Sequence, residues 1–257
     1  MLQARKRLGQ NFLHDANVIR RIVAAIAPQP DERFVEIGGG LGALSVALAE
    51  HCDRLDVVEI DSRLALELSQ RFRDNTRVRI HNADALKFDF STCVQHDAKI
   101  RVAGNLPYNI STPLLFHLAD FKTLILDMHF MLQKEVVDRM TARPGTKSYG
   151  RLTVMLSRWF DVEACFDIRP GSFRPQPRVM STLARLKVRQ SPRFPVADEQ
   201  YFAALVTHLF SMRRKTLGRA LRGRISAEAL AELGIDPTVR AETLSPERLA
   251  RLAAACH

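Results

Sequence analysis

Short apolar runs alternate with amphipathic stretches along most of this chain. The runs have the length of strands, and the stretches between them repeat their apolar positions with the period of a helix. The predicted strands are 34–37, 55–60, 78–80, 100–103, 123–132, 162–168 and 180–188, and the predicted helices are 15–27, 44–50, 63–72, 113–120, 134–141 and 151–160. This alternation predicts an α/β fold, with a doubly wound and mostly parallel sheet of seven strands.

The pattern changes after Ser191-Pro-Arg-Phe-Pro195, which is typical of a linker. Beyond it only helical periodicity remains, over 199–210, 213–221, 227–233 and 246–255. Ser226 and Ser245 are suitable N-caps, and Gly234 is suitable as a helix stop. We therefore expect two domains: an α/β domain over 1–190 that carries a basic N-terminal arm, and a small all-helical domain over 191–257.

Composition supports a folded protein with an acidic partner. The 257 residues are 46% hydrophobic, which is enough for a proper core, and the formal net charge is +10. The chain has no uncharged apolar stretch of about eighteen residues, so we expect a soluble cytoplasmic protein with no membrane contact. The cysteines at 52, 93, 165 and 256 show no metal-ligand spacing, so we expect free thiols and no metal.

A glycine-rich loop follows the first predicted strand, in Glu36-Ile-Gly-Gly-Gly-Leu-Gly42. Gly38 and Gly40 permit tight turning and let a ligand approach the backbone. The same spacing fits the dinucleotide fingerprint, so the loop alone does not distinguish NAD from S-adenosylmethionine. With S-adenosylmethionine the methionine end would lie at this loop, and Glu36 would lie near its ammonium group.

Two more carboxylates stand where the next strands end. Glu59 closes the second strand and can accept both hydroxyls of a ribose. Asp84 follows the third strand, where its carboxylate can accept from an adenine amino group while the Ala85 amide donates to the ring. Because ligands bind at the carboxyl ends of parallel strands, these residues predict an adenosine-containing cofactor.

The tetrapeptide Asn105-Leu-Pro-Tyr108 ends the fourth strand. The Asn105 side-chain oxygen and the Pro107 carbonyl can accept both hydrogens of an exocyclic amine, and proline holds the loop rigid. Tyr108 offers a ring on which a flipped-out base can stack. Since NAD gives no reason for an amine-holding loop beside it, S-adenosylmethionine explains the pattern better.

Two basic clusters complete the candidate chemistry. The first comprises Arg213, Arg214, Lys215, Arg219, Arg222 and Arg224, with no acid among them. The second comprises Arg5, Lys6, Arg7, Arg20 and Arg21. Such clusters bind phosphates without reading base sequence, so we expect RNA contacts from Arg213, Arg214, Lys215, Arg219 and Arg222 in particular.

In these motifs the chain resembles the bacterial small-subunit ribosomal RNA adenine dimethyltransferases, the kasugamycin-sensitivity methyltransferase family. The matching stretches, in order along nearly the whole chain, are Arg7-Leu-Gly-Gln-Asn-Phe-Leu13, the glycine loop, Val58-Glu-Ile-Asp61, Asn82-Ala-Asp84, Gly104-Asn-Leu-Pro-Tyr108, Leu132-Gln-Lys-Glu-Val136, Phe173-Arg-Pro-Gln-Pro-Arg-Val179 and Phe210-Ser-Met-Arg-Arg-Lys-Thr-Leu217. The glycine loop is unspecific by itself, whereas the ordered set is highly specific.

The resemblance implies a Rossmann-like methyltransferase domain that uses S-adenosyl-L-methionine. It implies dimethylation of N6 on two adjacent adenosines in the 3′-terminal hairpin loop of 16S rRNA, within the immature small ribosomal subunit. The residues that it places at the cofactor are Asn11, Leu13, Gly38, Glu59, Asp84 and Asn105. It places Pro107, Tyr108 and Phe173 around the target base, with Phe173 packing on the adenine from the other face.

The chain departs from this family at Gly39, where relatives often carry proline, and at Arg178, where lysine is common. Glycine loosens the loop without removing an expected contact, and arginine retains the charge. We expect a monomer. The rival interpretations are a large-subunit rRNA adenine methyltransferase, a DNA N6-adenine methyltransferase, an assembly factor that keeps the fold only as a scaffold, and an NAD-linked dehydrogenase.

Overall fold

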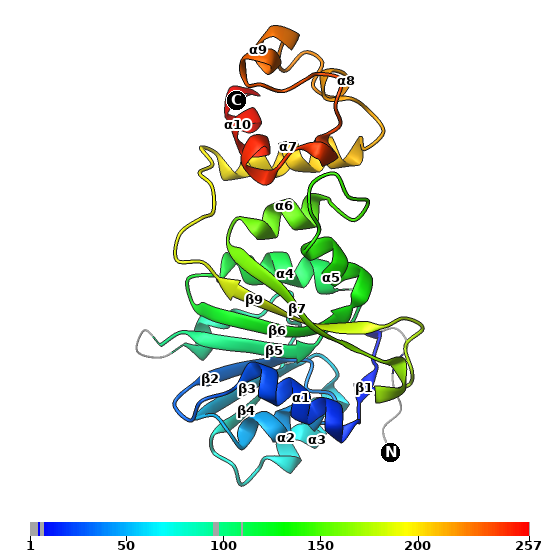
Figure 1. Cartoon of the computed structure of the whole chain (residues 1–257). Coiled ribbons are helices and arrows are strands. Elements are labelled where there is room, and N and C mark those ends of the chain that lie inside the picture. Colours follow the sequence, from blue (N-terminus) through cyan, green and yellow to red (C-terminus); the bar gives the residue numbers. More distant parts are fainter. Residues whose placement is uncertain (1–4, 6–7, 95–97, 109, 257) are drawn as a thin grey trace. The chain divides into compact units, whose positions relative to one another are not determined.

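The computed structural model describes residues 5, 8–94, 98–108 and 110–256 (Figure 1). Lys6 and Arg7 of the N-terminal basic cluster lie outside these residues. The chain forms two compact units: unit 1 is Met1–Val137 with Asp161–Val188, and unit 2 is Asp138–Phe160 with Arg189–His257. Residues 138–160, which the sequence pattern assigns to the first domain, therefore group with the C-terminal helices.

Unit 1 is built on a seven-stranded sheet in the order β4-β3-β2-β5-β6-β9-β7. Its strands are β2 (Arg33–Ile37), β3 (Arg54–Glu59), β4 (Val78–Asn82), β5 (Ile100–Asn105), β6 (Ile125–Gln133), β7 (Phe160–Ile168) and β9 (Ser181–Val188). The five strands from β4 to β6 pair in parallel, and β9 is antiparallel to β6. The predicted α/β fold with a seven-stranded sheet is confirmed.

The helices of this part of the chain begin and end near their predicted positions. They are α1 (Ala16–Ile26), α2 (Ala43–Ala49), α3 (Ser62–Arg71), α4 (Ser111–Asp120) and α5 (Lys134–Met140), with 3-10 turns η2 (Phe90–Cys93) and η3 (Pro170–Ser172). The Asp15 carboxylate accepts the N–H groups of Asn17 and Val18, as expected of an N-cap. Apolar residues of α1 and α2 share one core cluster with residues of β2 and β3. This core supports the strand ends that carry the candidate site.

A two-stranded sheet that the sequence pattern does not predict ties the N-terminal arm to unit 1. We define the arm as residue 5 and residues 8–13. Its strand β1 (Phe12–Leu13) pairs antiparallel with β8 (Phe173–Arg174), so that Leu13 lies opposite Phe173. Both of these side chains are buried in the unit 1 core. The arm is therefore fixed at its carboxyl end by backbone pairing and apolar burial.

Unit 2 is helical. Its helices are α6 (Arg151–Ser157), α7 (Glu199–Ser211), α8 (Leu217–Ala220), α9 (Ala227–Glu232) and α10 (Pro246–Cys256), with a 3-10 turn η4 (Ala241–Thr243). They enclose a core that includes Tyr149, Val154, Phe202, Leu209 and Leu249. No helix formed by the described residues is long and apolar enough to span a membrane.

Two helices of unit 2 are shorter than predicted. The predicted helix over 213–221 begins only at Leu217, because a turn closed by the Lys215 N–H and the Met212 carbonyl precedes it. The N–H groups of Leu217 and Gly218 then bond to the loop at 237–239. The helix predicted over 151–160 ends at Ser157, since Phe160 already begins β7. A local turn together with contacts to residues 237–239 decides the first boundary, and strand pairing decides the second.

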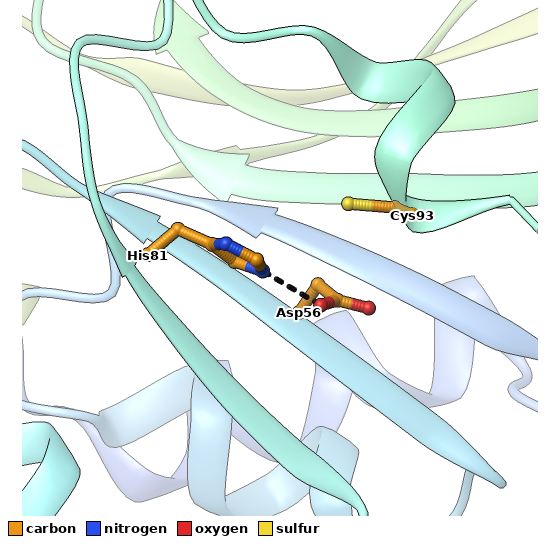
Figure 2. A group of neighbouring side chains, drawn as sticks. All are labelled: Asp56, His81 and Cys93. Atoms are coloured by element: carbon orange, nitrogen blue, oxygen red, sulfur yellow. Dashed lines mark hydrogen bonds and ion pairs between the residues drawn. The ribbon is translucent and has the colours of Figure 1, made fainter.

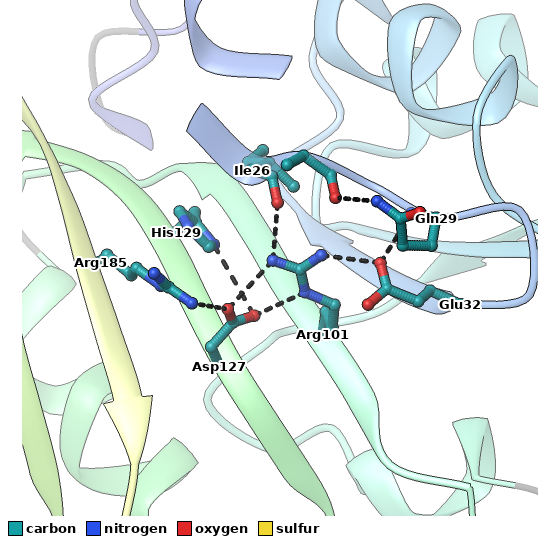
Figure 3. Close-up of polar contacts among 8 residues, drawn as sticks. Ile26, Gln29, Glu32, Arg101, Asp127, His129 and Arg185 are labelled. Atoms are coloured by element: carbon teal, nitrogen blue, oxygen red, sulfur yellow. Dashed lines mark hydrogen bonds and ion pairs between the residues drawn. The ribbon is translucent and has the colours of Figure 1, made fainter. Parts of the chain in front are cut away.

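The amino ends of β5 and β6 hold a buried ionic network (Figure 3). The Arg101 guanidinium donates to Asp127 (2.7 and 3.0 Å), to Glu32 (2.7 Å) and to the Ile26 carbonyl (2.8 Å). Arg185 on β9 donates to Asp127 at 3.2 Å. The Arg101 guanidinium and the Asp127 carboxylate are thus matched by hydrogen-bonding partners, which is the condition for burying an ion pair without a large penalty.

His129 lies beside this network on β6, opposite Arg185 on β9. Its ring is 1% exposed, and neither ring nitrogen has a hydrogen-bond partner among the described residues. Burial lowers the pKa of His129 to about 4; Asp127 opposes this shift, and Arg101 and Arg185 reinforce it. The imidazole is therefore held neutral.

Candidate active site

A single pocket in unit 1 collects all nine residues that were predicted to bind a cofactor. They are Asn11, Leu13, Glu36, Gly38, Gly40, Glu59, Asp84, Ala85 and Asn105. The pocket lies at the carboxyl ends of β2, β3 and β5, where β-α crossovers of an open sheet leave a crevice. Residues scattered over about ninety positions of sequence therefore line one cavity.

Gly38 and Gly40 need to be glycine for reasons of conformation and space. Their φ angles are 78° and 55°, in the left-handed region. A Cβ atom on Gly40 would also lie 3.2 Å from the Phe12 ring of the arm. The Gly40 N–H donates to Glu59 Oε2 at 3.0 Å, which fixes the loop to the end of β3.

Gly39 is tightly enclosed by side chains from β3 and α3. A Cβ atom there would lie 2.5 Å from Val57 Cγ1 and 2.8 Å from Leu68 Cδ1. These two side chains fill the volume that a larger residue would need. The loop is therefore packed at this position, although glycine alone suggested a looser one.

Glu59 is held by backbone amides on both oxygens. Its Oε1 accepts the Asp61 N–H at 2.9 Å, and its Oε2 accepts the Gly40 N–H at 3.0 Å. Burial raises its pKa, and these two amides oppose the rise. Each carboxylate oxygen keeps further acceptor capacity, so the group can still receive two hydroxyls of a ligand.

Glu36 has an unsatisfied buried oxygen at the pocket wall. The residue is 2% exposed, and its Oε2 has no hydrogen-bond partner among the described residues. Burial raises the pKa of Glu36 to about 8, with Ser45 opposing the shift and the nearby Glu59 charge adding to it. An unpaired buried carboxyl beside a cavity is a strong indication of a ligand site, and a cationic group would fit it.

Asp84 and Ala85 form a compact turn at the same pocket. Asp84 Oδ1 accepts the Leu86 N–H at 3.0 Å, and the Asp84 carbonyl accepts the Lys87 N–H at 2.9 Å. The turn holds both residues against the cavity, with Asp84 Oδ2 as a further acceptor.

Asn105 is oriented by the arm. Its Nδ2 donates to the Asn11 carbonyl at 2.7 Å. A carbonyl can only accept, so the amide nitrogen must face Asn11 and Oδ1 must face the other way. Gly104 precedes it at a close approach of two strands, where a Cβ atom would lie 2.4 Å from the Ile37 carbonyl oxygen. The Pro107 carbonyl accepts the Ile110 N–H at 3.2 Å and retains a second lone pair.

The two aromatic residues predicted for the base pocket do not line the cavity that holds the predicted cofactor residues. Of the residues that the structure describes, neither Tyr108 nor Phe173 is among those lining the cavity. The Tyr108 hydroxyl hydrogen-bonds to Ser181 Oγ at 2.8 Å, and burial raises its pKa. Phe173 is 1% exposed in the core. In this conformation the Phe173 ring is covered by protein and has no face free for a base.

Sequence reasoning missed several residues that line the pocket. They include Gln10 and Phe12 of the arm, Ile60, Ile110 and Met131. Ile60 directly follows Glu59, so its position at the end of a predicted strand could have identified it from the sequence. In the structure its side chain is 50% exposed. Met131 comes from β6 and is brought in by the strand order, which no motif indicates.

Asp56, His81 and Cys93 form a separate group away from this pocket (Figure 2). Their ligand atoms lie within 4.8 Å of one another, although their sequence spacing did not indicate a metal site. His81 Nε2 lies 2.7 Å from Asp56 Oδ1, and Arg54 also donates to Asp56 at 3.4 Å. Burial raises the pKa of Cys93 to about 12. The geometry is that of a hydrogen-bonded aspartate and histidine beside a neutral thiol; all four cysteines are free.

The five predicted RNA contacts are all exposed in unit 2: Arg213, Arg214, Lys215, Arg219 and Arg222. Arg213 is also engaged within the unit, since it pairs with Glu242 at 2.9 Å and donates to the Lys147 carbonyl at 2.9 Å. In the N-terminal cluster, Arg21 stacks over the Phe166 ring at 4.0 Å.

Comparisons with known proteins agree with these features. The "Ribosomal RNA small subunit methyltransferase A" of Aromatoleum aromaticum is 51% identical over 95% of this chain and 90% of its own length. The protein of the same name from Shewanella woodyi is 50% identical over 97% of this chain and 94% of its own length. The crystal structure of the 23S rRNA methyltransferase ErmE has a TM-score of 0.69 at 26% identity, covering 95% of this chain and 99% of its own.

A dimethyladenosine transferase from Plasmodium falciparum shares the fold, with a TM-score of 0.80 at 24% identity over 94% of this chain and 95% of its own. The sequence profile described as "Ribosomal RNA adenine dimethylase" matches residues 1–256. With these similarities, and a glycine loop, strand-end carboxylates and an Asn-Leu-Pro-Tyr segment gathered at one pocket, the chain belongs to the ribosomal RNA adenine dimethylase family.

Proposed function

We propose that this protein transfers methyl groups from S-adenosylmethionine to N6 of two adjacent adenosines in the 3′-terminal hairpin loop of 16S rRNA, on assembling small subunits. The observation that carries the proposal is the pocket in which an unpaired Glu36 oxygen and the Asn105 loop lie at neighbouring strand ends. Relatives about half identical to this chain carry a small-subunit name. The large-subunit enzyme ErmE is only 26% identical, which favours the small subunit.

The residues of the pocket fit S-adenosylmethionine by charge and hydrogen bonding. The unpaired Glu36 oxygen suits an ammonium group, and the fixed Glu59 carboxylate suits two ribose hydroxyls. Asp84 can accept from an adenine amino group, and Ala85 offers its amide to the ring. The arm residues Asn11 and Leu13 complete the wall. When bound, the cofactor supplies an electrophilic methyl group on a sulfonium sulfur.

The Asn105 loop prepares the poor nucleophile. An adenine amino nitrogen is planar because its lone pair is delocalised into the ring. Asn105 Oδ1 and the Pro107 carbonyl accept its two hydrogens, which favours a tetrahedral nitrogen with its lone pair directed outward. Catalysis is then positioning and electrostatic preorganisation, and the acidic methylated nitrogen gives its proton to solvent.

The target base would stack on Tyr108 after leaving its own stack, which is cheapest in an RNA loop. The proposed second stacking partner, Phe173, must first leave the core, since it is 1% exposed here. We therefore assign the holding of the amine to Asn105 and Pro107, and we assign stacking to Tyr108 ahead of Phe173.

Unit 2 supplies the docking surface for the RNA. Arg214, Lys215, Arg219 and Arg222 are exposed, and cations of this kind bind phosphates in a salt-dependent way. Arg213 also stabilises the adjoining turn through Glu242. We propose a monomer that acts in the cytoplasm, with specificity set by the fold of the RNA in the immature subunit.

The test is methyl transfer from labelled cofactor to undermethylated small subunits, large subunits and duplex DNA. We expect label only in small subunits, recovered as N6,N6-dimethyladenosine. Arg219→Ala with Arg222→Ala should raise the KM for subunits and flatten its salt dependence, while the exposed Arg251→Ala of α10 serves as the control. Label in large subunits or DNA, or no label with intact cofactor binding, would refute the assignment.

A further inference from the structure

The arm forms one wall of the cofactor pocket, and some of the residues that hold it in place do not line the pocket. Leu8, Gln10, Asn11, Phe12 and Leu13 all line the cavity. The carboxyl end of the arm is fixed by the pairing of β1 with β8, and its middle by the bond from Asn105 to the Asn11 carbonyl. Its amino end reaches a different anchor, the side chain of Asp61.

The Asp61 carboxylate contacts two residues of the arm. Gln10 Nε2 donates to Asp61 Oδ2 at 3.3 Å, and Arg5 Nη1 lies 3.6 Å from Asp61 Oδ1. The Arg5 N–H donates in turn to Gln10 Oε1 at 2.7 Å, so both arm residues are linked to each other. Asp61 itself is 1% exposed, and in the described part of the chain it is not among the residues that line the pocket.

The environment keeps Asp61 ionised. Arg63 donates to both of its oxygens, at 3.2 Å from Nε and at 2.8 Å from Nη2, and this is the main reason that the pKa of Asp61 falls to about 2. The carboxylate also caps α3 by accepting the Arg63 N–H at 3.1 Å. A cap needs one acceptor, whereas here both oxygens are occupied and the arm shares them.

We propose that Asp61 is a positioning residue that latches the N-terminal arm across the cofactor pocket. It acts through Gln10 and Arg5 and touches neither the cofactor nor the base. Because the arm carries Asn11, and Asn11 orients Asn105, the latch also supports the loop that holds the target amine. The inference rests on the proposed cofactor site.

The test compares Asp61→Asn and Gln10→Ala with Asp89→Asn. Asp61→Asn keeps an acceptor for the α3 cap but loses the charge. Asp89 likewise caps a turn, by accepting the Ser91 N–H at 3.0 Å, and it stands away from the arm. Amide hydrogen exchange at residues 8–13 reports the latch without any ligand, and calorimetry with S-adenosylmethionine reports its effect on the pocket.

We expect faster exchange at residues 8–13 in both arm variants, and about a tenfold loss of cofactor affinity, since a hydrogen bond to a charged group is removed. The KM for the cofactor should rise, and kcat should fall as well, because a released arm no longer orients Asn105 through the Asn11 carbonyl. The double variant Asp61→Asn with Gln10→Ala should be little worse than either single variant, because the two residues share one interaction. Asp89→Asn should show none of these effects.

Unchanged exchange in the arm would overturn the latch. Faster exchange with unchanged cofactor affinity would also overturn it, because the arm would then not control the pocket. Additive losses in the double variant would show that the two residues act separately. If the wild type bound no S-adenosylmethionine, the proposed function would fail, and exchange alone would decide whether Asp61 holds the arm.

Discussion

The two edges of the sheet in unit 1 accommodate buried ionisable side chains in different ways. At the amino ends of β5 and β6, Arg101 and Asp127 meet in paired hydrogen bonds, with Glu32 and Arg185 completing the network. At the carboxyl end of β2, Glu36 is as deeply buried, yet one of its oxygens has no partner in the described chain.

The comparison shows where stability and function lie in the same fold. Burying a charge is costly unless it is paired and hydrogen-bonded, so a fold selected for stability alone would pair every such group. At the amino edge, Arg101, Asp127 and Glu32 meet this condition. The carboxyl edge leaves an acid unsatisfied at a cavity, as expected of a site that completes its hydrogen bonds with a ligand.

Asp127→Ala should give the largest effect, because it leaves the Arg101 guanidinium buried without its main partner. We expect a loss of about 3–5 kcal/mol in the free energy of unfolding, measured with urea. Methyl transfer per folded molecule should be unchanged. Asp74→Ala is the control: its pair with Arg73 is exposed on both sides (88% and 78%), so its loss should leave stability nearly unchanged. Equal losses in both variants would remove the contrast between the edges.

Asn105→Ala tests the carboxyl edge. It should lower the rate of methyl transfer while leaving the free energy of unfolding nearly unchanged. Removing an acceptor that holds the target amine should lower kcat by about 10²–10³-fold, as the loss of a preorganised hydrogen bond does in other active sites. Asn105→Asp keeps side-chain acceptors but loses the donor to Asn11, so it separates holding the amine from orienting the loop. Single-turnover methylation of small subunits measures both variants, and full activity in Asn105→Ala would refute the mechanism.

Glu36→Gln should raise the free energy of unfolding of the protein without cofactor, and it should lower the affinity for the cofactor. The pKa of about 8 in the fold, raised above the ordinary 4.5, means that the folded state holds a proton which the unfolded state has released. Wild-type stability should therefore fall as pH rises from about 4.5 to about 8, and Glu36→Gln should lack this decline. We expect a gain of about 2–3 kcal/mol at pH 7 and at least about a tenfold loss of cofactor affinity. Lower stability at pH 7 would contradict the assignment.

His129→Leu tests a pH dependence at the amino edge that is opposite in direction to that of Glu36. The pKa of His129 is lowered to about 4 in the fold, so between pH 6.5 and 4 the unfolded state binds a proton that the folded state does not. Wild-type stability should fall by about 2 kcal/mol from pH 7 to pH 5 through this residue. Urea unfolding at both pH values should show a smaller fall in the variant, and an unchanged fall would assign the effect to other groups.

The sequence was informative wherever the signal was local. Apolar runs located the seven strands, and the rule that ligands bind at the carboxyl ends of parallel strands brought Glu36, Glu59 and Asp84 to one pocket. Asn105 could be found because an Asn-Leu-Pro-Tyr segment after a strand is chemically unusual. These inferences needed only the order of elements and the side of the sheet at which each strand ends.

Contacts between distant residues could not be inferred in this way. The strands β1 and β8 have two residues each, too few to show a period, so the burial of Phe173 by pairing with the arm was not predicted. The approach of His81 to Asp56 likewise depends on the register of β3 and β4. Such partners are set by packing, which a single sequence does not reveal.

The close packing around Gly39 limits the order in which this chain can change. The family resemblance leads us to expect proline at this position, but here Val57 and Leu68 occupy the space that a ring would need. A proline would require at least one of these two side chains to shift or to be replaced by a smaller one. The outcome of a substitution at residue 39 therefore depends on the side chains present at residues 57 and 68, so these three positions are constrained together.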